Sequence, residues 1–216
     1  IMLGEHANLS DLNSNMKKNP LSIKNKRNFH VPFNFQSFIL NLLTIKIFNF
    51  VFYFYGKISK KKKLIDYDTF FYPLDYILDW NKMYGNKGFA QFQCVIPLKN
   101  AAKGVRKLLE VISESKTNSF LSVLKRFGKQ ESKISFPMEG YTLTLDFPIT
   151  KKSLELMDKL DKLTIEYEGR FYLAKDSRIN KDIFRNSDVR FEKYLEFRSS
   201  KMKEVFSSCQ SERLGI

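Results

Sequence analysis

The fold is decided by residues 87–115, KGFAQFQCVIPLKNAAKGVRKLLEVISES, because the spacing of their hydrophobic residues changes once along the stretch. From Phe89 to Pro97, apolar residues alternate with Gln91 and Gln93, which predicts a strand. From residue 99 to 115, apolar residues recur at helical spacing, at Ala101, Val105, Leu108, Leu109 and Ile112. A strand therefore leads directly into a helix.

The downstream sequence repeats this arrangement. Residues 119–127 and 141–147 are predicted as strands, and residues 170–174 as a short final strand. Thr150 can cap a helix over residues 151–168, which Gly169 ends. The order strand, helix, strand, strand, helix, strand predicts an α+β fold with a ferredoxin-like split βαβ core, in which both helices cover one face of an antiparallel sheet. Residues 1–37 read as irregular, and residues 182–216 as two further helical stretches.

Polar side chains line the strand face that those helices leave open. Gln91 and Gln93 share one side of the first strand, and Thr142, Thr144 and Asp146 share one side of the third. Lys125 adds a cation from the second strand, on a side that depends on the register. The face could bind a polyhydroxylated or phosphorylated ligand, or it could simply be solvated, as is common in antiparallel sheets.

Composition narrows the class of protein. Hydrophobic residues make up 43% of the chain, enough for a packed core, and this excludes a disordered protein. The formal net charge of +14 favours acidic partners such as nucleic acid, anionic lipid or phosphorylated substrates.

Cys94 and Cys209 have no metal or redox spacing, which favours a reducing compartment, and the two histidines are too few for a His-based metal site. Neither GxGxxG nor GxxxxGKS/T occurs.

Residues 38–56 are almost continuously apolar, and Lys57 and residues 60–63 follow as a basic cluster. The length meets the minimum for a membrane-spanning helix. However, Lys46 lies near the middle of the segment, and Asn41 and Asn49 would also be costly to place in the hydrocarbon core of a bilayer. The alternatives are a segment packed on its own domain, or one resting in a lipid interface.

Three smaller patterns have competing interpretations. Residues 172–178, YLAKDSR, place a cation, an anion and a cation after the last strand; this is either a functional loop or a helix start capped by Asp176 or Ser177. Residues 87–95 partly match an RNA-stacking strand, with Phe89 as the exposed aromatic. Asp158 and Asp161, on the predicted helix, read as solvent-facing charge, as do Glu166 and Glu168.

Several stretches in order resemble one known family. They are Gly4-Glu5-His6, FFYPLDYILDWN at 70–81, YGNKGFAQFQCVIP at 84–97, SFLSVLKRFG at 119–128, SFPMEGYTLTLDFPI at 135–149, GRFYLAKDSR at 169–178 and the ending Val205-Phe206 with Arg213-Leu214. Together they resemble the C-terminal half of the FAD-linked oxidases that act on decaprenylphosphoryl-β-D-ribose, which are of the vanillyl-alcohol-oxidase type.

The resemblance implies how the chain is organised. Residues 1–170 would form part of a substrate-binding domain, and residues 171–216 a segment that returns to an FAD-binding domain. Ile1 reads as an internal start inside a strand, so that FAD domain would precede this sequence. In the family, the region matching 38–63 covers the substrate entrance and would suit an isoprenoid tail. This favours peripheral contact with a membrane over a spanning helix, and a location in the cytoplasm or at the membrane surface.

The family's reaction oxidises the ribose 2′-hydroxyl of a polyprenyl-phosphate sugar to a ketone, with hydride passing to the flavin of FAD. A separate short-chain reductase completes the epimerisation to arabinose, a precursor of cell-wall arabinan. By resemblance, Lys175 lies beside flavin and substrate as the catalytic cation, and Tyr172 lies near the flavin. The resemblance also assigns Gln93, Lys125, Phe127 and, at the entrance, Phe71 to the substrate pocket. Gln91 and Asp146, which alternation places on the polar strand faces, are predicted to join it. Thr142 and Thr144 stand where the mycobacterial enzymes have Asn and Cys, so the sugar or its lipid could differ.

Two other functions stay open. A sugar-lactone oxidase of the D-arabinono-1,4-lactone type, or an alditol oxidase, would share the superfamily but change the substrate. A basic single-stranded RNA-binding module would use the net charge and Phe89, although nucleic acid is the less favoured partner. The fragment alone is expected to be inactive and to bind FAD poorly.

Overall fold

A computed structural model describes residues 4–22, 27–35, 41–59, 62–72, 74–119, 121–130, 135–202 and 205–216. The chain divides near residue 87 into two compact units, and each is described by itself. The predicted strand at Ile1 lies outside the described residues. The predicted division between residues 1–170 and 171–216 concerns function and stays a prediction.

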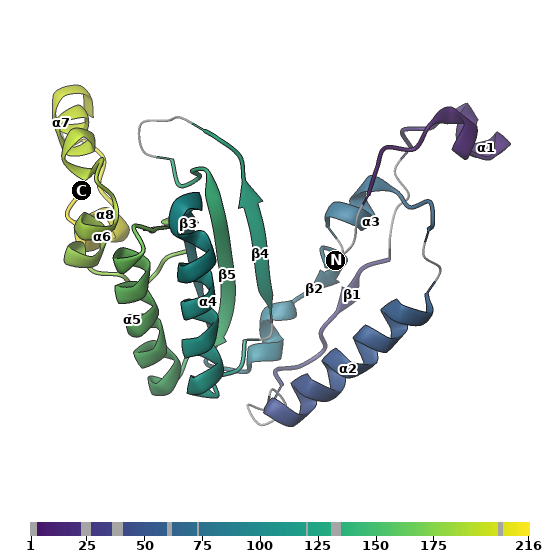
Figure 1. The fold of residues 1–216 in the computed structure, drawn as a ribbon, viewed down its shortest axis with the longest axis horizontal. Helices are drawn as coiled ribbons and strands as arrows, with labels where there is room; N and C mark the ends of the chain where they lie inside the picture. The colour runs from purple at the N-terminus through teal and green to yellow at the C-terminus, as the bar shows by residue number, and fades with distance from the viewer. Residues whose placement is uncertain are drawn as a thin grey trace. The chain divides into compact units, whose positions relative to one another are not determined.

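The unit from residue 87 onward confirms the predicted α+β class. Its described residues form four strands, β3 (Phe89–Pro97), β4 (Ser122–Phe127), β5 (Gly140–Pro148) and β6 (Arg170–Phe171). They lie in the order β4-β5-β3-β6, and every neighbouring pair is antiparallel. The fourth strand thus lies beside the first and the third beside the second, as in the split βαβ arrangement. Two helices, α4 (Leu98–Ser115) and α5 (Lys151–Glu166), cover one face (Figure 1).

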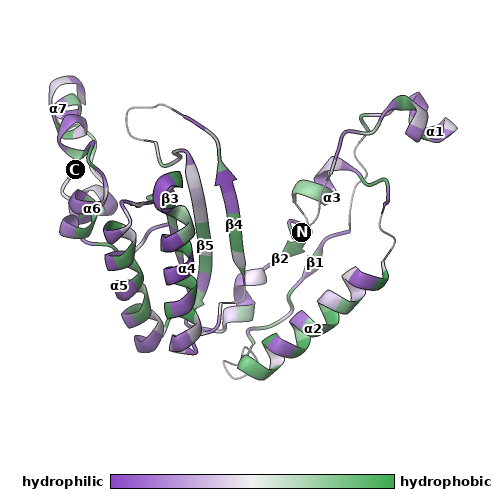
Figure 2. Cartoon of the chain, viewed as in Figure 1, coloured by the Kyte–Doolittle hydropathy of each residue, from purple (hydrophilic) through white to green (hydrophobic). Residues whose placement is uncertain are grey.

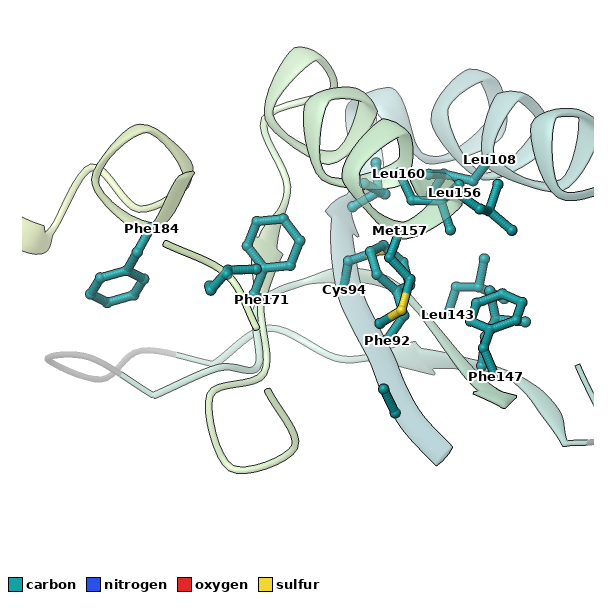
Figure 3. Packing of buried hydrophobic residues seen from close by; sticks show 14 of the residues in the cluster. Phe92, Cys94, Leu108, Leu143, Phe147, Leu156, Met157, Leu160, Phe171 and Phe184 are labelled. Carbon is teal, nitrogen blue, oxygen red and sulfur yellow. The ribbon is translucent and has the colours of Figure 1, made fainter. Parts of the chain in front are cut away.

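The core lies between these helices and the sheet (Figure 3). The sheet contributes the alternate residues of β3 and β5, including Phe92, Cys94, Leu143 and Phe147. The helices contribute Leu108, Leu156, Met157 and Leu160, of which Leu108 and Leu160 are completely buried. Burying each such side chain stabilises the fold by roughly 1.5–3 kcal/mol. The Cys94 thiol is part of this core, and burial raises its pKa to about 12.

Thr150 caps α5 as predicted, since its side chain accepts a hydrogen bond from the Ser153 N–H. The end of the helix differs from the prediction. Glu168, not Gly169, adopts the left-handed conformation, with φ of 57°. Gly169 is needed for close packing instead, because a Cβ there would lie 2.7 Å from the Val95 carbonyl oxygen.

The last strand is shorter than the predicted 170–174. β6 ends at Phe171, and after one further backbone bond from the Tyr172 N–H to the Gln93 carbonyl the chain turns. The turn forms because the N–H groups of Lys175 and Asp176 both donate to the Tyr172 carbonyl. Residues 173–175 therefore leave the sheet early.

The C-terminal region holds three described helices where two were predicted: α6 (Lys181–Ser187), α7 (Phe191–Met202) and α8 (Cys209–Leu214). Asn180 caps α6 by accepting from the Ile183 N–H, so neither Asp176 nor Ser177 is the helix cap. Phe184, Phe191 and Leu214 are buried in the same core cluster as the sheet residues.

The other unit contains short elements within the region predicted as irregular: η1 (Leu9–Asp11), α1 (Ser14–Lys18) and β1 (Phe29–His30). Beyond α2 (Leu42–Ile58) lie α3 (Tyr67–Phe71), β2 (Ile77–Leu78) and η2 (Trp80–Tyr84), and β1 pairs with β2 in parallel. Within the described part of the chain, no helix combines the length and apolarity needed to cross a membrane.

Candidate functional site

The sheet register brings the predicted polar residues onto one face. Gln91 lies opposite Asp146 and Gln93 opposite Thr144, while Lys125 of β4 lies opposite Thr142. Side chains of directly opposed residues point to the same side of a sheet. The register therefore assigns Lys125 to the polar face, on the side away from α4 and α5.

Two amide side chains reach across this face between strands. Gln91 Nε2 donates to Asp146 Oδ1 at 2.8 Å, and Gln93 Nε2 donates to Thr142 Oγ1 at 3.1 Å. The residues of β5 beneath them are buried: Thr142 and Asp146 have 0% exposure and Thr144 has 7%. The β5 part of this row is therefore not solvated, whereas Gln91 and Gln93 are half-buried and Lys125 is exposed.

Two buried oxygen atoms on this face have no hydrogen-bond partner within the described part of the chain. They are Gln93 Oε1 and Asp146 Oδ2. A buried acceptor left without a donor costs roughly 1–3 kcal/mol, so such atoms call for an explanation. Both are acceptors, and hydroxyl groups of a ligand would supply the donors that they need.

Two kinds of interaction act in opposite directions on the pKa of the Asp146 carboxyl. Burial raises its pKa, while the hydrogen bond from Gln91 and the positive charge of Lys175 oppose that rise. Lys175, exposed in the turn after β6, is thus close enough to act electrostatically on this carboxyl. The predicted catalytic cation therefore lies near Asp146 of the predicted polar face.

Aromatic side chains form one wall beside the polar row. Tyr172 stacks on Phe136, with ring centroids 4.7 Å apart, and Phe127 meets Phe136 edge to face at 5.9 Å. Tyr172 and Phe127 are predicted site residues, whereas Phe136 was missed. Its place in the SFPMEG stretch at 135–140 was the available signal, but Phe136 lies outside the regular strand alternation.

The loop that carries Lys175 is held by the Asp176 side chain. Its Oδ1 accepts from the N–H groups of Arg178 and Ile179, at 3.1 and 3.0 Å. Its Oδ2 pairs with Arg213 of α8 at 2.9 Å. Gln210, also on α8, donates through Nε2 to the carbonyl oxygens of Leu173 and Asp176, at 2.6 and 3.2 Å. Helix α8 therefore fixes both sides of Lys175.

Helix α5 holds the same loop from another direction. Arg178 pairs with Asp158 at 2.6 Å and with Asp161 at 2.7 Å. Asp161 is only 2% exposed, so its interpretation as solvent-facing charge is wrong. Burial raises the pKa of Asp161 to about 6, even though Arg178 acts in the opposite direction.

Phe71, the predicted entrance residue, is the last residue of α3 and is 62% exposed. It belongs to the first compact unit, whereas the polar face belongs to the second. Its place at the entrance to this site stays a prediction.

Comparison with known proteins finds similar sequences. The whole chain is 32% identical, over 218 residues, to decaprenylphosphoryl-beta-D-ribose oxidase of Mycolicibacterium smegmatis. It is also 27% identical, over 144 residues and 65% of its length, to an uncharacterized protein in the mprA 5′ region of Streptomyces coelicolor. No protein-family model matches the chain. The similarity over the full chain agrees with the predicted resemblance: the chain is similar to that oxidase and is consistent with a C-terminal segment of its family.

The chain spans 47% of the length of the Mycolicibacterium oxidase, and the Streptomyces match spans 39% of that protein. The similarity to an oxidase therefore applies to this segment alone, and the reaction, the substrate and the cofactor of a whole protein do not follow from it.

Proposed function

We propose that this chain supplies the substrate-binding face of an FAD-linked oxidoreductase that oxidises a sugar hydroxyl of a polyprenylphosphoryl pentose, the ribose 2′-hydroxyl in the first step of epimerisation to arabinose. The observation that carries the proposal is the pair of acceptors, Gln93 Oε1 and Asp146 Oδ2, on one buried strand face near Lys175. Similarity to an oxidase named for a prenylphosphoryl ribose supports it.

Each group has a role that its surroundings allow. Gln93 and Asp146 would accept hydrogen bonds from sugar hydroxyls, and Gln91 would hold the Asp146 carboxylate in place through its 2.8 Å bond. Thr142 orients the Gln93 amide so that its oxygen is left over for a ligand. The exposed ammonium of Lys175 would stabilise negative charge that develops as a hydroxyl loses its proton.

The residues present fit one edge of a flavin. The Lys175 cation and the Phe136–Tyr172 stack are of the kind that accompanies an aromatic, electron-accepting ring, and FAD would supply acceptance of hydride. A phosphate-cradling glycine loop does not occur in the sequence, so the diphosphate would be held elsewhere in a complete protein.

The alternatives share parts of this site. A sugar-lactone or alditol oxidase would use the same acceptors on a free sugar, and the polar face alone favours neither substrate. An RNA-binding strand has less support, because Phe89, its predicted stacking residue, is only partly exposed, and Phe92 on the same strand is 2% exposed in the core. The short-chain reductase partner follows from the reaction and is proposed with it.

The test uses the complete natural protein that contains these 216 residues, loaded with FAD. Adding farnesylphosphoryl ribose should bleach the flavin absorbance, whereas arabinono-lactone and alditols should not. If the flavin is bleached by the lactone or by an alditol and not by farnesylphosphoryl ribose, the proposed substrate is wrong and the lactone or alditol oxidase is supported instead.

Lys175→Ala should lower the rate of bleaching by about 10²–10³-fold, with a smaller effect on substrate affinity, because its charge acts mainly as negative charge develops. Lys129→Ala, an exposed lysine in the loop after β4, is the matched control and should leave the rate unchanged. Unchanged bleaching in Lys175→Ala would remove this residue from the mechanism.

A further inference from the structure

Helix α2 is an apolar helix whose surface is uncovered. None of its 17 residues is buried. Its large apolar side chains are between 45% and 66% exposed at Leu43, Ile47, Phe48, Val51, Phe52, Phe54 and Tyr55. Figure 2 shows hydrophobic residues recurring along the helix, interrupted by hydrophilic ones. A contiguous exposed apolar surface of this kind marks an interaction site.

The polar residues of α2 form a narrow stripe. Lys46, Asn49, Tyr53 and Lys57 follow one another at steps of three, four and four residues, which places them along one side of an α-helix. The remaining circumference is apolar apart from Thr44 and Gly56. The helix therefore has one thin cationic edge and a wide face of aliphatic and aromatic groups.

The sequence on both sides of this helix carries charged side chains of a single sign. Residues 12–65 contain neither Asp nor Glu. The same stretch carries the cations Lys17, Lys18, Lys24, Lys26, Arg27, Lys46, Lys57 and Lys60 to Lys63. A stretch of this length with many cations and no acidic residue favours a polyanionic partner over a second copy of itself.

We propose that α2, together with Lys62 and Lys63 beyond its end, docks on an anionic lipid surface. The apolar face would enter the boundary between headgroups and acyl chains, while Lys46, Lys57, Lys62 and Lys63 would interact with the headgroups. Nucleic acid would satisfy the lysines but leave the aromatic face in water, and an apolar protein groove would satisfy the face but not the charge. A lipid surface satisfies both. The inference rests on α2 and stands apart from the proposed reaction.

The test is sedimentation of the 216-residue chain with vesicles. The chain should bind vesicles of phosphatidylglycerol and phosphatidylcholine, and should bind neutral phosphatidylcholine vesicles at least about tenfold more weakly. The double variant Lys46→Glu/Lys57→Glu should lose about tenfold or more in affinity for the anionic vesicles. The matched control, Lys103→Glu/Lys107→Glu, changes the same charge on exposed positions of α4 and should lose clearly less.

Single tryptophan substitutions test which side of α2 faces the lipid. Phe52→Trp, on the apolar face, should be quenched by brominated lipid, whereas Tyr53→Trp, on the polar stripe, should be quenched clearly less. Absence of binding to anionic vesicles, equal losses for the α2 and α4 variants, or equal quenching at positions 52 and 53 would each overturn the proposal. If the chain still self-associates when vesicles are present, and if the tryptophan of Phe52→Trp is then shielded from the brominated lipid, the apolar face of α2 binds a second copy of the chain. That result would also overturn the proposal of a lipid surface.

Discussion

At the scale of single residues, Asp146 and Asp161 are both buried carboxyls, yet their surroundings give them different roles. Asp161 faces the Arg178 guanidinium and joins α5 to the loop after β6. Asp146 is held by a neutral amide at one oxygen, and its other oxygen has no partner within the described residues. Asp161, paired with arginine, has a structural role, whereas Asp146, with one oxygen unpaired among the described residues of the polar face, is the carboxyl that we propose for ligand binding.

The pH dependence of stability should reveal Asp161. Burial raises its folded pKa to about 6, above the ordinary value of 3.8. Folding therefore favours the protonated carboxyl: the associated stability is fully present below pH 3.8 and is lost as pH rises from 3.8 through 6. The difference of about two units between the ordinary and the folded pKa of Asp161 corresponds to about 3 kcal/mol of unfolding free energy.

The measurement compares wild type with Asp161→Asn, which cannot titrate, by urea unfolding at several pH values. The difference in unfolding free energy, wild type minus variant, should fall between about pH 4 and pH 6.5. Asp158→Asn, at an exposed position of the same helix, is the control and should give a flatter difference. A difference for Asp161→Asn that is constant or rises with pH would contradict the raised pKa.

At the scale of elements, α8 positions a loop to which it is not adjacent in sequence. Its Arg213 and Gln210 reach Asp176 and the backbone on both sides of Lys175. Arg213 and Asp176 are largely shielded from water, with side chains 27% and 10% exposed, so removing Arg213 would leave the Asp176 charge poorly solvated and without this partner. The C-terminal helix is thereby part of the support of the site.

Removing this support should loosen the loop before it unfolds the domain. Arg213→Ala is expected to lower the unfolding free energy by about 1.5–3 kcal/mol, the range for hydrogen bonds to charged groups. Amide hydrogen exchange at Lys175, Asp176 and Ile179 should accelerate more than exchange in β3 and β5, because those amides bond within the loop.

Arg106→Ala, an exposed arginine of α4, supplies the comparison and should leave exchange in the loop unchanged. Arg213→Lys should restore part of the protection, since a single cation would still face Asp176. If Arg213→Ala accelerates exchange uniformly across the sheet, α8 supports the whole fold and has no specific effect on the Lys175 loop.

The elements also show how far the sequence alone could be taken. Alternation in β3 and β5 predicted which side of each strand is apolar, because a half-buried sheet imposes a period of two. Thr150 was recognisable as a cap from local chemistry alone. The burial of Asp161 was not recognisable, because its partner Arg178 lies 17 positions away and the contact forms only when α5 packs beside the loop. The early end of β6 depended likewise on turn bonds to the Tyr172 carbonyl.

At the scale of the whole molecule, the two proposed functions lie in different compact units. The polar face with Lys175 belongs to the unit from residue 87 onward, and α2 belongs to the unit before it. A net charge of +14 is unevenly placed along the sequence, since residues 12–65 hold cations and no acids. Attachment to an anionic surface would bring the chain to the kind of membrane in which a polyprenyl-phosphate substrate resides.

The last prediction concerns what the chain can bind unaided. The 216-residue chain should not retain FAD, because it presents a cation and aromatic rings but has no glycine-rich loop whose N–H groups could cradle a diphosphate. The chain is mixed with excess FAD and desalted, and its visible spectrum is then recorded. Circular dichroism of the same sample verifies that the chain is folded, and a known flavoprotein treated in parallel verifies that bound FAD survives desalting. A stoichiometric yellow complex would show that this segment holds the nucleotide itself, and the division of labour proposed for the complete enzyme would have to be redrawn around residues 87–216.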